Sequence, residues 1–417
     1  MNKRNVFLWT LYDFANSIVT IVFFLYFSQW LVIDHGVSDL GYNLLHAVSS
    51  LLLLLTAPIL GSIADRTGQQ QSYLNRITIL VVLFYVGVSF VALFAPNQVF
   101  LAMVFFVFAS YFYQFSFVFY NALLPKLAPA NLWGRISGIG QAGNWLGQIT
   151  GLLITLPLAS GAVYLFGQAG RAQTFLPATI VFFLLTLPML ILFKTPVKEF
   201  VKEKLDIRGE YKKQWLRFKD LISVPNVGLF LLGYFFFNDA IVTSANNFPI
   251  YLQSVFAVSD GTKSLLMIGI LATSVFGALA SGWAADRLGL KKTLMIVLGS
   301  WIVILPALGL VTNFRLFVVL TIAMGLLYGA IWTVTRAFMT AICPSDKLNF
   351  GFSFYTLAER VSTLVGPLSW GLITTLLVDM GPVRYRLAVI SMSVFVLIGV
   401  AIVHKINLGN PNVQSLT

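Results

Sequence analysis

Two stretches of the chain carry almost the same eight residues, GSIADRTG from Gly61 to Gly68 and GWAADRLG from Gly282 to Gly289. Both fit the pattern Gly-x-x-Ala-Asp-Arg-x-Gly, and the second copy begins 221 residues after the first. Each copy directly follows a long apolar segment. Two chance matches at corresponding places are improbable, so the pattern predicts that the second half of the chain repeats the first.

Further agreements between the two halves support this repeat. Their displacements, 219 to 223 residues, are close to that of the two motifs. The matching pairs are Ile18-Val19-Thr20 with Ile241-Val242-Thr243, Pro125 with Pro344, and Gly147 with Gly366. The halves therefore share one order of elements.

The composition places the protein in a membrane. Of the 417 residues, 58% are hydrophobic and 10% are charged, whereas soluble domains carry about 25% charged residues. The net charge of +12 would suggest a nucleic-acid partner in a soluble protein, but here the basic residues lie in short segments between apolar runs, where they orient helices. We expect a lipid bilayer and no nucleic acid as partner, and, with one cysteine and three scattered histidines, no metal and no cofactor.

Twelve apolar stretches are long enough to cross a bilayer, which takes about 20 helical residues. They fall at 6–33, 43–63, 77–95, 99–121, 135–158, 174–194, 226–257, 263–283, 293–312, 315–341, 353–378 and 384–404. The sequence thus predicts an all-α membrane protein of twelve helices in two six-helix bundles. Because six is even, both bundles have the same orientation in the membrane, which makes the repeat a parallel one.

The basic residues predict the orientation of these helices. Most lie on the side of both termini, and the other side holds only Arg171, Lys263, Arg315, Arg384 and Arg386. By the positive-inside rule both termini are cytoplasmic. Short loops without an organelle signal favour a bacterial inner membrane, and we expect a monomer.

One long polar connection divides the chain into an N-terminal bundle at 1–194, a linker at 195–225 and a C-terminal bundle at 226–417. The linker interleaves aromatic and aliphatic residues with lysines and arginines. This mixture suits helices that lie on an anionic leaflet, and it suits a solvated tether equally well.

The repeated motif, in the loops after the second and eighth spans, resembles the signature loop of the major facilitator superfamily. That resemblance covers the whole chain and implies a transporter whose loops hold the cytoplasmic side closed in the outward-open state. The residues it marks are Gly61, Asp65, Arg66, Gly68, Gly282, Asp286, Arg287 and Gly289. The first copy departs from the family pattern, because Gln69, Gln70 and Gln71 replace the usual basic residues. The alternative to a gating role is that the charged residues of the motif only set the topology of the helices.

The first helix adds a narrower resemblance. Its sequence WTLYDFANS, Trp9 to Ser17, is similar to the opening of the vacuole-effluxer branch of this superfamily, which includes fungal proteins that release amino acids from the vacuole. The resemblance implies an amino acid or a similar small polar metabolite as substrate.

Polar residues inside predicted spans mark the candidate site, because an ionisable side chain at mid-bilayer costs roughly 2.5–3.5 kcal/mol even on insertion scales. Asp13 and Asn16 lie in the first helix, and Asn238 and Asp239 in the seventh, where Asp239 takes the repeat position of Asn16. We expect a carboxylate from each half to face a central cavity and contact a substrate cation or carry a proton. The further candidates are Gln141, Asn144, Trp145, Gln148, Arg336, Glu359 and Arg360. The alternative for these groups is hydrogen-bonded glue between helices.

These features predict a secondary transporter that moves a small polar solute by alternating access, with a proton as candidate coupling ion. A membrane-embedded enzyme would need clustered nucleophiles, bases or metal ligands, and the sequence shows none. A transport-dead sensor or assembly partner remains the alternative.

Overall fold

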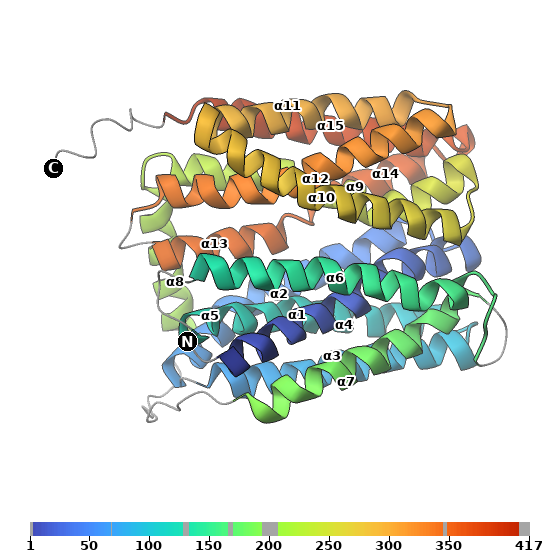
Figure 1. Ribbon diagram of the computed structural model, residues 1–417, viewed down its shortest axis with the longest axis horizontal. Coiled ribbons are helices and arrows are strands. Elements are labelled where there is room, and N and C mark those ends of the chain that lie inside the picture. Colours follow the sequence, from blue (N-terminus) through green and yellow to red (C-terminus); the bar gives the residue numbers. More distant parts are fainter. Residues whose placement is uncertain are drawn as a thin grey trace. The chain divides into compact units, whose positions relative to one another are not determined.

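The computed structural model describes residues 3–67, 69–127, 133–165, 170–193, 207–344 and 348–407. The described part is helical, and the chain folds as two compact units. Unit 1 comprises residues 1–211 and 258–264, and unit 2 comprises residues 212–257 and 265–417. Within each unit, the long helices run along a common direction (Figure 1).

The elements of unit 1 follow the first six predicted spans. The first helix, α1, continues through two π-helical segments, so that one span reaches from Lys3 to Asp34. The elements are α1 (Lys3–Val22), η1 (Phe23–Phe27), η2 (Trp30–Asp34), α2 (Asp39–Thr67), α3 (Gln70–Phe94), α4 (Val99–Ala122), α5 (Leu124–Leu127), α6 (Trp133–Ala159), η4 (Arg171–Thr174) and α7 (Phe175–Leu192).

The remaining elements belong to unit 2, except for the first residues of α8 and α10, which the residue ranges above place in unit 1. They are α8 (Ile207–Ile222), α9 (Val227–Phe256), α10 (Asp260–Leu288), α11 (Leu290–Leu310), α12 (Phe314–Ile342), α13 (Leu348–Val361), α14 (Val365–Leu376), η5 (Val378–Met380) and α15 (Val383–His404).

Ten helices of the described part are long and apolar enough to cross a membrane, and they fall on ten of the predicted spans. The predicted span at 135–158 is α6. The predicted span at 353–378 is not one helix, because α13 ends at Val361 and α14 begins at Val365. The predicted eleventh span therefore consists of two helices separated by a short break.

Pro367 favours this break, although Pro157, Pro188, Pro249 and Pro306 lie inside other helices that continue past them. In a continuous helix the ring of Pro367 would collide with the carbonyl group of Thr363, and it has no N–H to donate. Placed in the first turn of a new helix, where N–H groups have no intrahelical partner, proline fits well. The chain therefore interrupts the helix at Ser362–Leu364 and restarts it two residues before Pro367.

Glycines on α6 let it approach α1 closely in unit 1. A Cβ atom on Gly143 would lie 2.9 Å from the Thr10 side chain, and one on Gly147 would collide with the carbonyl oxygen of Phe14. One helical turn further along α6, a Cβ atom on Gly151 would lie 2.9 Å from the carbonyl oxygen of Ile18. This close packing fixes the rotation of α6 and turns Asn144 toward α1.

Candidate functional site

Asp13 anchors a hydrogen-bonded chain between α1 and α6 in unit 1. Its side chain is buried, and its Oδ1 accepts a hydrogen bond from Asn144 Nδ2 at 3.1 Å. Gln148 Nε2 then donates to Asn144 Oδ1 at 2.8 Å. Asn144 and Gln148 lie one helical turn apart, so these two candidates from the fifth span form a chain of hydrogen bonds to the carboxylate of the first.

Aromatic rings hold α1 around Asp13. Trp9 stacks on Tyr120 of α4 with ring centroids 4.3 Å apart, and its Nε1 donates to the Tyr120 carbonyl oxygen at 3.1 Å. Tyr12 stacks on the same ring at 5.5 Å and hydrogen-bonds Thr78 of α3 through its hydroxyl group. The motif residues Trp9 and Tyr12 thus position Asp13, which lies between them and Asn16 on α1.

Asn16 carries an unsatisfied acceptor. Its side chain is buried, and its Nδ2 donates to the carbonyl oxygen of Tyr12 at 2.8 Å. Its Oδ1 has no hydrogen-bond partner among the described residues. A buried oxygen without a partner is rare in native proteins and leaves one acceptor available near Asp13.

Asp239 of α9 caps the second half of the broken helix in unit 2. It is fully buried, and its Oδ2 accepts a hydrogen bond from the backbone N–H of Gly366 at 2.6 Å. The Thr243 hydroxyl group donates weakly to Oδ1, at 3.4 Å. Because the first N–H groups of α14 carry the positive end of its dipole, a carboxylate is well placed there.

The preceding residue, Asn238, serves the other end of the break. Its Nδ2 donates to the Ser362 hydroxyl oxygen at 2.5 Å and to the Glu359 carbonyl oxygen at 3.3 Å. That carbonyl lies in the last turn of α13, where intrahelical partners run out. Asn238 and Asp239 together, named here the helix-break clip, supply a donor to α13 and an acceptor to α14.

The described part shows no hydrogen bond or ion pair that joins the side chains of the other predicted site residues to Asp13 or Asp239. Gln141 and Trp145 lie half-buried on α6, and Arg336 is exposed on α12. Glu359 is half-buried at the end of α13, and no ion pair joins it to Arg336 in the described chain. The side chain of Arg360 lies outside the described residues.

An ionic cluster in unit 1 was not predicted as a site. Arg171 Nε donates to Asp260 Oδ2 at 2.8 Å, and Lys263 Nζ lies 2.7 Å from Asp260 Oδ1. Arg171 also pairs with Asp34, and Lys263 hydrogen-bonds Gln29. In the sequence, Arg171 and Lys263 indicated only topology, although the spacing of Asp260 and Lys263 by three residues in one helix was a usable signal.

The second copy of the repeated motif is described, whereas the side chains of Gly61, Asp65, Arg66 and Gly68 lie outside the described residues. Gly289 has a φ of 86°, which favours glycine and explains its place in the turn between α10 and α11. The guanidinium group of Arg287 lies over the Trp283 ring, 4.0 Å from its centroid. Asp286 is exposed beside them, and Gly282 faces open space.

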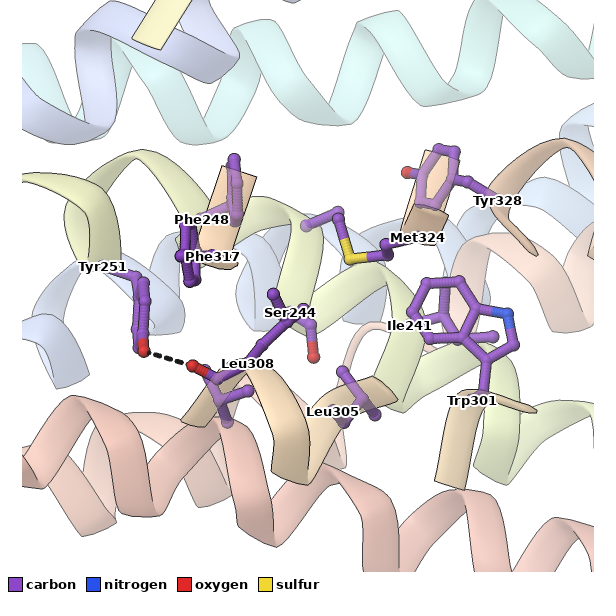
Figure 2. Close-up of a pocket in the computed structure, with 12 residues that line it drawn as sticks. Ile241, Ser244, Phe248, Tyr251, Trp301, Leu305, Leu308, Phe317, Met324 and Tyr328 are labelled. Carbon is purple, nitrogen blue, oxygen red and sulfur yellow. Dashed lines mark hydrogen bonds between the residues drawn. The ribbon is translucent and has the colours of Figure 1, made fainter. Parts of the chain in front are cut away.

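Unit 2 also contains a small internal cavity between α9, α11, α12 and α15. Its lining is aromatic and aliphatic, with Phe248, Tyr251, Trp301, Phe317 and Tyr328 among the lining residues. Figure 2 shows the Tyr251 hydroxyl group donating to the carbonyl oxygen of Leu308, at 2.8 Å. With room of about 30 Å³ for water-sized molecules and no carboxylate or cation in its lining, it does not resemble a site for a charged solute.

The chain has relatives among known proteins. It is 26% identical over 389 residues to an uncharacterized MFS-type transporter, YxiO, of Bacillus subtilis, with 86% of each chain covered. It is also 26% identical over 176 residues to autophagy-related protein 22 of Yarrowia lipolytica, a match that covers 39% of this chain and 29% of the relative.

Solved structures show the same fold. The crystal structure of the nucleoside transporter NupG matches with a TM-score of 0.74 and 12% identity, covering 98% of this chain and 100% of that one. The predicted major facilitator fold is therefore confirmed.

A family model described as "Vacuole effluxer Atg22 like" matches residues 42–414. The match begins after the WTLYDFANS motif, so it supports the predicted resemblance independently of those residues. The chain belongs to the vacuole effluxer Atg22-like family of MFS-type transporters.

Proposed function

We propose that the protein moves a small polar or zwitterionic solute of the amino-acid class across the membrane by alternating access. The observation that carries this proposal is the pair of buried carboxylates, Asp13 and Asp239, in the first helix of each half. Lipid-facing helices do not keep such groups, whereas a transport path uses them to bind and release charge.

The two carboxylates have different roles in this proposal. Asp13, linked to Asn144 and Gln148, contacts an ammonium or hydroxyl group of the solute, and the unsatisfied Asn16 Oδ1 accepts a further hydrogen bond from it. These amide groups donate as well as accept, which suits a solute that is not simply a cation.

Asp239 is the proton carrier in this proposal. Its charge faces the N-terminus of α14, so protonation would remove the anion that now caps that helix. The Gly366 N–H then donates a hydrogen bond to a carboxylate group of the solute, or again to Asp239 once Asp239 has released its proton. Such broken helices, with half-helix ends at the ligand, recur in secondary transporters.

We also propose that both termini lie in the cytoplasm of a bacterial cell, that the protein sits in the inner membrane, and that it works as a monomer. The distribution of Lys and Arg supports the orientation. Labelling of single cysteines placed at Ser160 and His404, in a variant without Cys343, tests it. A membrane-impermeant reagent applied to intact cells should label position 160 and spare position 404.

The transport proposal is tested first with the purified protein. A panel of amino acids, sugars and nucleosides is scored by the rise in melting temperature, because a ligand that favours the folded state stabilises it. Hits then enter counterflow assays in proteoliposomes. An amino acid that stabilises the protein and exchanges across the bilayer supports the proposal, whereas binding without counterflow would identify a sensor instead.

A further inference from the structure

The amphipathic helix α8 packs one side against unit 2. The Phe218 ring lies 5.0 Å from that of Phe354 in α13, and Leu221 is fully buried. A Cβ atom on Gly228, in the first turn of α9, would lie 2.6 Å from the Ile222 carbonyl oxygen. The end of α8 is therefore tightly fixed to the start of a membrane-spanning helix.

The exposed part of α8 combines large apolar groups with positive charge. Trp215 and Leu216 are each 55% exposed. Four exposed cations surround them, Lys212, Lys213, Arg217 and Lys219, and Asp220 is the one acid between positions 212 and 222. The Lys219 ammonium group lies 5.5 Å from the centre of the Trp215 ring. A helix that faces water would carry polar residues in place of this tryptophan and leucine.

The position of α8 in the chain identifies what covers this exposed part. Only residues 223–226 separate α8 from α9, which is long and apolar enough to span a membrane. In Figure 1, α8 runs at a steep angle to α13. A helix held so close to a membrane span and turned across it lies at the level of the lipid headgroups.

We propose that α8 is an interfacial helix that binds anionic lipid headgroups. Trp215 and Leu216 enter the boundary between headgroups and acyl chains, and the four cations contact the lipid phosphates. The charge of this exposed part matches an anionic leaflet, and its tryptophan matches the residues that anchor proteins at membrane interfaces. The inference is independent of the transported solute.

The test uses the full-length protein in vesicles. A Cys343→Ala, Leu216→Cys variant carries an environment-sensitive fluorophore, and acyl-chain-brominated lipids report its contact with the bilayer by quenching. We expect quenching to increase as phosphatidylglycerol replaces phosphatidylcholine. Each cation replaced by glutamine should weaken the lipid-bound state about fivefold, and replacing all four should abolish the dependence on phosphatidylglycerol.

Two controls make the result decisive. A variant that keeps the charge, with Lys→Arg at positions 212, 213 and 219 and Arg217→Lys, should retain the dependence. A fluorophore at position 160 should show none. A label at 216 that stays unquenched in both lipids would show that the segment is a solvated tether, and equal quenching without the four cations would show that the headgroup charge is not recognised; either result overturns the proposal.

Discussion

The fifth helix of the first half and its repeat partner in the second half differ at one decisive position. In unit 1, Gly147 is followed by Gln148, and α6 runs unbroken from Trp133 to Ala159. In unit 2, the matching Gly366 is followed by Pro367, and the helix is split into α13 and α14. Both glycines pack against the first helix of their own half.

This difference shows how two similar halves can hold their carboxylates in different ways. The glutamine keeps α6 continuous and adds a side-chain amide next to Asn144, which binds Asp13. The proline opens the helix and exposes backbone groups, which the helix-break clip satisfies. Asp13 therefore interacts with side chains that can rearrange, whereas Asp239 interacts with the backbone of a helix end.

The largest expected effect comes from moving the proline into unit 1. Gln148→Pro would remove a helical hydrogen bond in α6 and bring the ring against the carbonyl group of Asn144, with no helix-break clip to compensate. We expect a loss of about 3 kcal/mol or more in the free energy of unfolding. Thermal melting in detergent measures it, with Gln148→Ala as the matched control, which should lose about 1 kcal/mol or less.

The ionic cluster gives the next largest effect and a reference for the carboxylates. Asp260→Asn would leave Lys263, which is fully buried, without its carboxylate partner. Breaking a buried pair from one side typically costs about 3 kcal/mol. Melting of this variant beside Asp379→Asn, which changes an exposed acid in η5, should show a large loss for the first and almost none for the second. Equal melting temperatures would mean that the cluster does not stabilise unit 1.

Asp239→Ala sharpens the comparison by removing only the acceptor of the clip. The Gly366 N–H would lose its partner in a buried place, which we expect to cost about 2 kcal/mol. Asp239→Asn keeps an oxygen at this place and should recover at least half of that loss. If alanine and asparagine melt at the same temperature as the parent protein, Asp239 does not cap α14.

The smallest effect is expected at Asn144. Asn144→Ala removes hydrogen bonds to Asp13 and Gln148, but Gln148 is half-buried and the buried Asp13 lies near the polar Asn16, so the expected loss is about 1 kcal/mol. We expect a larger fractional loss in the transport rate than in the free energy of unfolding. A melting temperature that drops as far as that of Asp239→Ala would contradict the proposed difference between the two carboxylates.

Much of the fold could be predicted from the sequence, because membrane spans need long apolar runs and matching motifs indicate the repeat. The site could be predicted only in part. The i, i+4 spacing of Asn144 and Gln148 indicated one face of a helix, but only the close packing on α1 turns that face toward Asp13. Gly366-Pro367 was visible, yet proline in a membrane helix can also produce a mere kink.

The ionic cluster shows the limit most clearly. Asp34, Arg171 and Asp260 come from three segments that lie far apart in the sequence, and each stands near the end of an apolar run, where a charge needs no partner. Their pairing depends on how the helices are placed in unit 1. From the sequence alone, setting the topology of the helices was a sufficient explanation for the presence of Arg171 and Lys263.

The most direct test of the proposed division of roles is solute accumulation driven by a proton gradient in proteoliposomes. We predict that Asp239→Asn still exchanges solute in counterflow but no longer accumulates it, that Asp13→Asn is impaired in both assays, and that Asp379→Asn behaves like the parent protein. Accumulation at the parent rate and with unchanged pH dependence in both Asp13→Asn and Asp239→Asn would contradict the account.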